Sequence, residues 1–201
     1  DVEPRDGAGS SRARDARVRL IDPESNQTTT AMTLAVTQAN EDGLTGVVLD
    51  PDFGENGWVY LFWSPQDVGT DGPHNRVSRF TYDEATRTIS AASEEKVLVI
   101  PTQRETCCHA GGDMVFDGDD NLVIVTGVLT NPGGSAGCAP LGERAGRTSY
   151  DAQRTSANTN DLRGKVLRIH PEDAGTSTLP EGALVAPGAA AAPAGDGRSA
   201  R

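Results

Sequence analysis

The chain has 201 residues, the length of one domain or slightly more. It carries 18 basic and 29 acidic residues, a formal charge of −11, which argues against nucleic acid or an anionic membrane as a partner, since both need clustered Lys and Arg. No apolar run approaches the ~20 residues of a membrane-spanning helix, and we expect no signal peptide in this chain. We therefore expect neither kind of partner.

Apolar residues make up only 36% of the chain, beside 23 glycines and 12 prolines, so we expect a turn-rich protein with a modest core. Residues 1–16 are polar and irregular, and we expect a disordered or truncated segment there. Residues 186–201 form a low-complexity Ala/Pro/Gly tail that we expect to be disordered. The folded region is expected over 17–185, with a long polar loop over 130–161.

Between these ends the apolar residues recur with a period of two, which is typical of β-strands, and helical periodicity is absent over any useful length. Turn residues such as Asn-Gly and Asp-Pro separate the runs. The predicted strands lie, in chain order, within 16–22, 27–36, 43–50, 56–65, 75–83, 96–101, 113–117, 122–127, 164–171 and 182–187. This pattern predicts an all-β fold.

A repeat is visible when two stretches are aligned. "GVVLDPDFGENGWVYLFWSP" and "DMVFDGDDNLVIVTG" each have an apolar run, an Asp, turn residues, an Asn and a stronger apolar run, with Asp50 and Asp117 67 positions apart. Each unit then supplies two further strands, and four antiparallel strands per repeat are typical of a propeller blade. The first two strands would close an earlier blade. We predict a partial β-propeller of about two and a half blades, a piece of a larger ring.

The stretch "ETCCHAGGDMVFD" (105–117) concentrates reactive side chains. A structural zinc site needs four ligands, which adjacent Cys107 and Cys108 cannot easily share, and Cys138 is remote. A C-x-x-C redox motif is absent. We therefore predict no metal site. A vicinal disulfide between Cys107 and Cys108 stays open and would suit an exported protein.

Two interpretations of His109 stay open at this point. It is either a loop histidine that bonds to the backbone, or a general base, since an imidazole exchanges protons near neutral pH. In a propeller, a loop that enters an innermost strand opens on the central channel, and Gly111 and Gly112 would let a ligand approach the backbone.

Two other polar stretches have less specific signals. "FDGDDN" begins like a calcium loop, but Val128 stands where the twelfth-position acid belongs, so a hairpin turn is predicted. The long loop is either functional or disordered. Side chains in it that could line a pocket are Tyr150, Arg154, Asn158, Asn160 and Asp161.

Three stretches in the same order resemble the soluble glucose/sorbosone dehydrogenase family, which consists of six-bladed quinoprotein propellers, often secreted. They are "EDGLTGVVLDPDFGENGWVYLFWSP", "CCHAGGDMVFDGDDNLVIVTG", and "TSANTNDLRGKVLRIHPED" followed by "LPEGAL". The resemblance covers residues 17–185. It implies oxidation of an aldose or related sugar at the anomeric carbon, with pyrroloquinoline quinone (PQQ) and calcium as cofactors, in an extracellular or periplasmic protein.

The resemblance also assigns site residues. His109 matches the catalytic base, and Glu41 and Asp42 match a region that lines the sugar pocket; no cofactor-binding residue is assigned. Relatives commonly read T-G-D-N where this chain has Thr126 to Leu129, and their Asp would orient the histidine. The family's cofactor contacts come largely from later blades.

Three interpretations of function follow. The first is a fragment of a quinoprotein-type sugar dehydrogenase, inactive in this truncated form if cofactor binding needs the later blades. The alternative is a non-catalytic carbohydrate-binding or scaffolding propeller module. A third is a gene fragment with no autonomous function.

Overall fold

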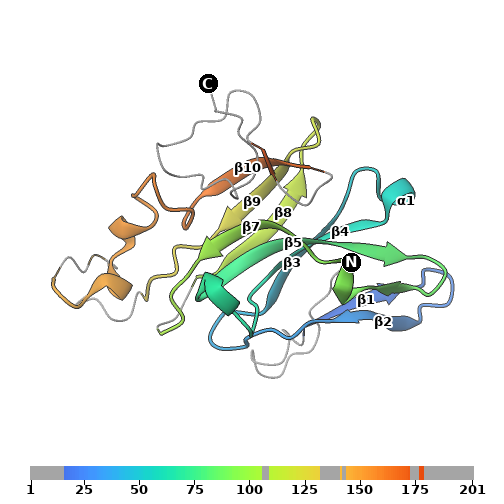
Figure 1. Ribbon diagram of the computed structural model, residues 1–201, viewed down its shortest axis with the longest axis horizontal. Helices are drawn as coiled ribbons and strands as arrows, with labels where there is room; N and C mark the ends of the chain where they lie inside the picture. The colour runs from blue at the N-terminus through green and yellow to red at the C-terminus, as the bar shows by residue number, and fades with distance from the viewer. Residues whose placement is uncertain (1–15, 106–108, 132–140, 142–143, 173–176, 179–201) are drawn as a thin grey trace.

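The computed structural model describes residues 16–105, 109–131, 141, 144–172 and 177–178 (Figure 1). Most of 1–16, all of 186–201 and the strand predicted within 182–187 lie outside these residues. The strands are β1 (Arg17–Ile21), β2 (Thr28–Thr33), β3 (Leu44–Leu49), β4 (Trp58–Trp63), β5 (His74–Asp83), β6 (Thr88–Ile89), β7 (Glu95–Pro101), β8 (Gly111–Phe116), β9 (Leu122–Thr126), β10 (Val166–Pro171) and β11 (Ser177–Thr178). The short helical turns are α1 (Phe53–Asn56), η1 (Gly69–Asp71), η2 (Ala91–Ser93), η4 (Thr148–Tyr150) and η5 (Ala152–Arg154).

All pairings between these strands are antiparallel. β1 and β2 form a hairpin, β3-β4-β5-β7 form one four-stranded sheet with β6 extending it at the far end of β5, and β8-β9-β10-β11 form a second. The two larger sheets share one apolar core, and the hairpin packs against the opposite face of the first (Figure 1). The predicted all-β fold of two four-stranded blades and half of another is confirmed.

Two apolar cores hold the sheets together, and β4 contributes to both because its side chains alternate. Leu61 and Trp63 face the β1–β2 hairpin, whereas Tyr60 and Phe62 face the second large sheet. All four are at most 6% exposed, and burying a side chain of this size stabilises the fold by roughly 1.5–3 kcal/mol. The densest apolar run of the sequence therefore becomes the strand shared by both cores. The second large sheet contributes Met114, Leu122, Ile124 and Ile169.

Glycines let the first strands of the two large sheets, β3 and β8, approach each other. A Cβ atom on Gly46 would lie 1.9 Å from the carbonyl oxygen of Gly112, and one on Gly112 would lie 2.2 Å from Thr45 Oγ1. Gly112 also has a φ of 120°, which disfavours any other residue. We expected Gly111 and Gly112 to leave space for a ligand, but protein atoms fill that space, since a Cβ on Gly111 would lie 2.5 Å from the nitrogen of Gly127.

The sequence repeat has a structural counterpart in two matching turns. Asn56 Nδ2 donates to Asp50 Oδ1 at 2.7 Å, and Asn121 Nδ2 donates to Asp117 Oδ1 at 3.2 Å. The second turn is a β-hairpin between β8 and β9, as predicted, and Arg168 Nε donates to Asp117 Oδ2 at 2.6 Å. In the first turn, α1 is a single helical turn. The carboxylates that looked like calcium ligands are therefore turn-stabilising groups.

Candidate functional site

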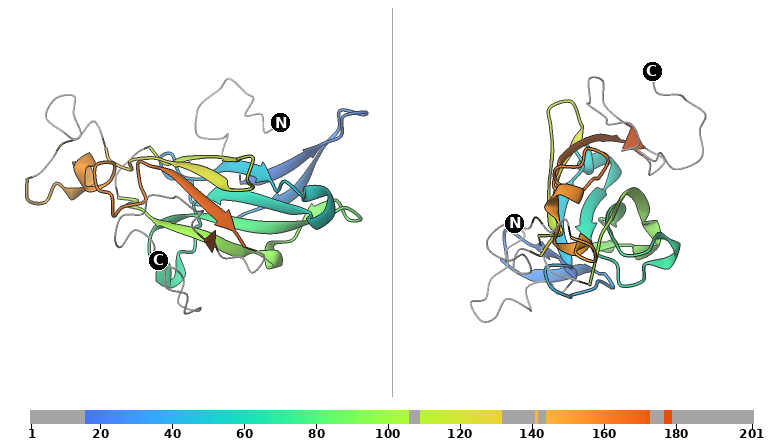
Figure 2. Two further views of the ribbon diagram at one scale, coloured as in Figure 1. Left: turned by 90° about the horizontal axis from the view of Figure 1, so that it is seen from above. Right: turned by 90° about the vertical axis from the view of Figure 1, so that its left-hand side faces the viewer.

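Three segments meet at the end of the sheets opposite α1. They are the loop before β3 (38–43), the loop before β8 (102–110, of which 106–108 lie outside the described residues) and the segment after β9 (127–131). In Figure 1 residues 144–165, the described part of the connection from β9 to β10, extend from this same end, and Figure 2 shows them projecting along the long axis. This is where His109, Glu41 and Asp42 lie.

His109 is held by its backbone from two sides. Its N–H donates to a carboxylate oxygen of Glu41, 68 residues earlier, and its carbonyl oxygen accepts from the N–H of Leu129 at 3.2 Å. The residue is exposed, and its φ of 67° lies in the left-handed region, which is uncommon for a residue other than glycine. Such strain, of about 1–3 kcal/mol, persists only where the surroundings enforce it. The structure thus presents an exposed imidazole on a fixed backbone.

The segment after β9 is shaped around His109. A Cβ on Gly127 would lie 1.6 Å from the His109 carbonyl oxygen, so this position tolerates only glycine. The N–H of Gly127 donates to the carbonyl oxygen of Ala110 at 3.0 Å. Leu129 is buried and also left-handed, with a φ of 51°, a conformation that asparagine adopts far more readily than leucine. Half-buried Val128 therefore sits opposite the His109–Ala110 peptide, where the family motif has its Asp.

Glu41 and Asp42 point in different directions. Glu41 is half-buried and reaches His109, whereas Asp42 is only 6% exposed and turns into the protein. Asp42 Oδ2 lies 3.6 Å from Arg104 Nε, and Ser64 Oγ lies 3.3 Å from Asp42 Oδ1. Of the two residues predicted to line a sugar pocket, only Glu41 therefore contacts the backbone of His109.

The buried groups beneath the site were not predicted. Arg104 also donates from Nη2 to the carbonyl oxygen of His74 at 2.7 Å, and burial lowers its pKa while Asp42 opposes that shift. His74 is fully buried; its Nε2 accepts from Arg76 Nε at 3.0 Å, and burial lowers its pKa. The sequence offered no signal for these roles, because polar residues in a loop beside prolines are ordinarily exposed.

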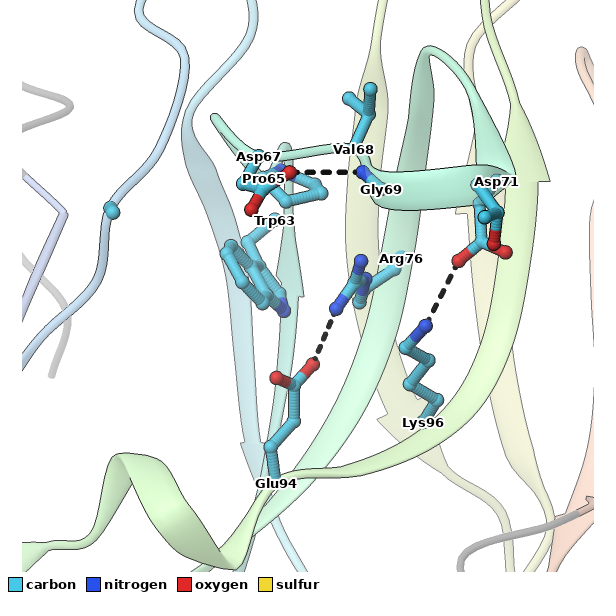
Figure 3. A pocket seen from close by; sticks show the side chains of 11 residues that line it. Trp63, Pro65, Asp67, Val68, Gly69, Asp71, Arg76, Glu94 and Lys96 are labelled. Carbon is cyan, nitrogen blue, oxygen red and sulfur yellow. Dashed lines mark hydrogen bonds and ion pairs between the residues drawn. The ribbon is translucent and has the colours of Figure 1, made fainter.

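A separate open pocket of about 410 Å³ lies on the hairpin side of the first large sheet (Figure 3). Its charged walls are paired, since Arg76 Nη1 lies 2.9 Å from Glu94 Oε1 and Lys96 Nζ lies 2.9 Å from Asp71 Oδ2. Trp63 forms part of its floor, with the Arg76 guanidinium 5.1 Å from the ring centroid. Neither His109 nor Glu41 lines it, so it is not part of the candidate site.

The described part of the long loop is ordered by internal contacts. The Arg147 guanidinium stacks on Tyr150 at 3.9 Å, Arg154 Nε lies 3.6 Å from Asp151 Oδ2, and Arg163 Nε donates to Asp161 at 2.8 Å. Lys165 Nζ donates to the carbonyl oxygens of three residues at 2.8 to 3.0 Å: Thr155, Ser156 and Arg163. None of the five side chains predicted in this loop lines the pocket in Figure 3; they are Tyr150, Arg154, Asn158, Asn160 and Asp161.

Two further sequence predictions concern cysteine and metal chemistry. Cys107, Cys108 and Cys138 lie outside the described residues, so the vicinal disulfide stays a prediction. Among the residues that the structure does describe, no group of three or more His, Cys, Asp or Glu side chains could hold a metal ion. Within the same residues no helix is long and apolar enough to cross a membrane.

Comparison with known proteins gives a family and a fold. The family model described as Glucose / Sorbosone dehydrogenase matches residues 6–182. Similar solved structures include the PQQ-bound aldose sugar dehydrogenase of Streptomyces coelicolor (TM-score 0.58, 23% identity, covering 78% of this chain and 39% of that one). The apo aldose sugar dehydrogenase of Escherichia coli is also similar (TM-score 0.55, 22% identity, covering 80% of this chain and 41% of that one). No curated protein sequence matches. The chain thus spans about two fifths of the length of these two structures.

Proposed function

Since the chain belongs to the glucose/sorbosone dehydrogenase family, we propose that it is part of a quinoprotein-type sugar dehydrogenase in which His109 removes the hydroxyl proton of an aldose at the anomeric carbon. The observation that carries this proposal is the fixed, left-handed backbone of an exposed histidine between Glu41 and Leu129. A general base must hold its ring in reach of the substrate proton, and a backbone bonded on both sides limits its drift. Glu41 lies close enough to accept a hydrogen bond from another sugar hydroxyl with its remaining lone pairs.

The described residues do not by themselves fit PQQ, whose carboxylates need cationic partners. Beside His109 the two loops offer the acids Glu41 and Asp42, and the guanidinium of Arg104 is already paired with Asp42. Calcium likewise lacks a ligand cluster among the residues described. We therefore derive no step through the cofactor; in this proposal the part of the enzyme that this chain does not span holds PQQ and calcium.

An exposed apolar face supports a larger assembly. Val115, Val125 and Val166 are 58%, 43% and 71% exposed on the face of the second sheet that points away from the first. Val125 pairs with Val166, and the equivalent pair in the preceding repeat is Phe62 with Val77. Phe62 and Val77 are at most 1% exposed, because the next sheet covers them. In the whole protein, which we propose to be extracellular or periplasmic, a further blade would cover these valines.

The test is aldose-dependent reduction of a dye, with PQQ and calcium supplied, by the whole protein that contains this chain. His109→Gln should lower the rate by about 10²- to 10⁴-fold, the range for loss of a general base. The matched control His170→Gln, on β10, should leave it unchanged. Absence of dye reduction by the unaltered whole protein would refute the proposed function.

A non-catalytic carbohydrate-binding module is the second candidate, and Val128 favours it. A histidine without an acid to orient it loses control of its tautomer, which weakens a base but not a binding site. Sugar binding measured by calorimetry, with neither PQQ uptake nor dye reduction, would support this candidate. An increase in dye reduction in Val128→Asp would instead support the enzyme.

A further inference from the structure

We propose that Arg104, through its buried ion pair with Asp42, is a positioning residue for His109. The inference rests on the proposed role of His109, but its structural part can be tested without activity. Arg104 and His109 belong to the same connection between β7 and β8, and Asp42 directly follows Glu41 in the loop before β3. Two loops far apart in sequence are therefore joined at two points, His109 to Glu41 and Arg104 to Asp42.

The contact between Arg104 and Asp42 supports the contact between His109 and Glu41. The Glu41 side chain is only half-buried, so its carboxylate is freer to turn than that of buried Asp42. The Asp42 side chain is 9% exposed and the Arg104 side chain 17%, so this pair is shielded from water and cannot rearrange freely. Because the Asp42 side chain is held in place, the peptide between Glu41 and Asp42 is held as well. This fixes the backbone position from which the Glu41 side chain extends.

Arg104 is itself anchored independently of Asp42. Its Nη2 donates to the carbonyl oxygen of His74, which belongs to the sheet strand β5. The adjacent Gln103 donates from Nε2 to the carbonyl oxygen of Ser149 at 3.0 Å and also to that of Leu129, whose N–H bonds His109. Residues 103 and 104 thus connect β5 to both groups that bond the His109 backbone. Gln103 reaches Leu129, and Arg104 reaches Asp42, the neighbour of Glu41.

Loss of the guanidinium would leave the Asp42 carboxylate buried without its cation, a state that proteins relieve by moving the charged group to water. Such a movement would displace residues 41–42 and release the His109 N–H. The expected signature is local, at His109, rather than a general loss of stability.

The experiment is amide hydrogen exchange by NMR on Arg104→Met in the full chain. The exchange rate of the His109 amide should rise about tenfold or more, while amides of β4 in the cores exchange as before. The control Arg76→Met removes a buried arginine of β5 that is paired with Glu94, and should leave the His109 amide protected. A protected His109 amide in folded Arg104→Met, or equal loss of protection in Arg76→Met, would overturn the proposal.

A second variant covers the case in which Arg104→Met does not fold. Arg104→Met with Asp42→Asn leaves no buried unpaired charge, so it should fold. It also lacks the ion pair that joins the two loops, so residues 41–42 are no longer held in place and the His109 amide should still exchange fast; retained protection would again overturn the proposal. If the unaltered whole protein reduces the dye, Arg104→Met should lower its kcat with KM little changed. If the whole protein shows no dye reduction, the proposed enzymatic function fails, and the exchange measurement still decides the role of Arg104.

Discussion

Substituting Gly112 should test whether close approach of the two large sheets stabilises the fold. Alanine at this position would have to adopt a φ of 120°, at a cost of about 1–3 kcal/mol. Its Cβ would lie 2.2 Å from Thr45 Oγ1 and 2.8 Å from Phe62 Cδ1, and relieving such overlaps costs about 1–3 kcal/mol more. We expect Gly112→Ala to lower the free energy of unfolding by about 2–6 kcal/mol, a large part of the ~5–15 kcal/mol of a typical domain.

The assay is urea unfolding followed by circular dichroism and by Trp fluorescence, at equal protein concentration. Gly118→Ala is the matched control, because a Cβ there meets no atom within 4 Å, and its unfolding free energy should change by no more than about 0.5 kcal/mol. If Gly112→Ala were as stable as Gly118→Ala, the β3–β8 contact would not be the tight junction inferred here.

Two other predictions concern the long loop before β10 and the turn between β8 and β9. Lys165→Met should lower the free energy of unfolding by about 1–2 kcal/mol, because three carbonyl oxygens lose their charged donor. Tryptic cleavage after Arg154 and Arg163 should become faster, and unchanged cleavage would contradict this. Arg168 holds the pKa of Asp117 below its ordinary value of 3.8, so their ion pair stabilises the fold above that pH and the effect is lost as the pH falls below it. Asp117→Asn should therefore have a lower urea midpoint than the unaltered chain at neutral pH, and the two midpoints should approach each other in acid. A difference that stays constant with pH would be inconsistent with this ion pair.

The fold was largely predictable because its signals are local. Alternation of apolar residues gave the strands, and the recurrence of an Asp, turn residues and an Asn gave the repeat, since a hairpin turn is specified by the few residues within it. The helical turn α1 and the short strands β6 and β11 were missed, because two to four residues carry too little pattern to stand out.

The candidate site was only partly predictable. His109, Glu41 and Asp42 came from resemblance to a family motif, and the structure brings His109 and Glu41 into contact. The sequence did not reveal that neighbouring Asp42 is buried. Side chains of adjacent residues diverge, and which of the two faces water depends on what the fold packs against them.

The sequence by itself therefore determined the class of fold, the repeat and the residue types available for chemistry, because strand alternation and turn chemistry act over a few positions. Only the tertiary structure decided which distant groups meet. Glu41 and His109 are 68 residues apart and Asp42 and Arg104 are 62 apart (104 − 42), and their contacts exist because two glycine-bearing strands pack closely enough to bring both loops to one end. That packing depends on side-chain volumes across two sheets, which no local stretch of the chain contains.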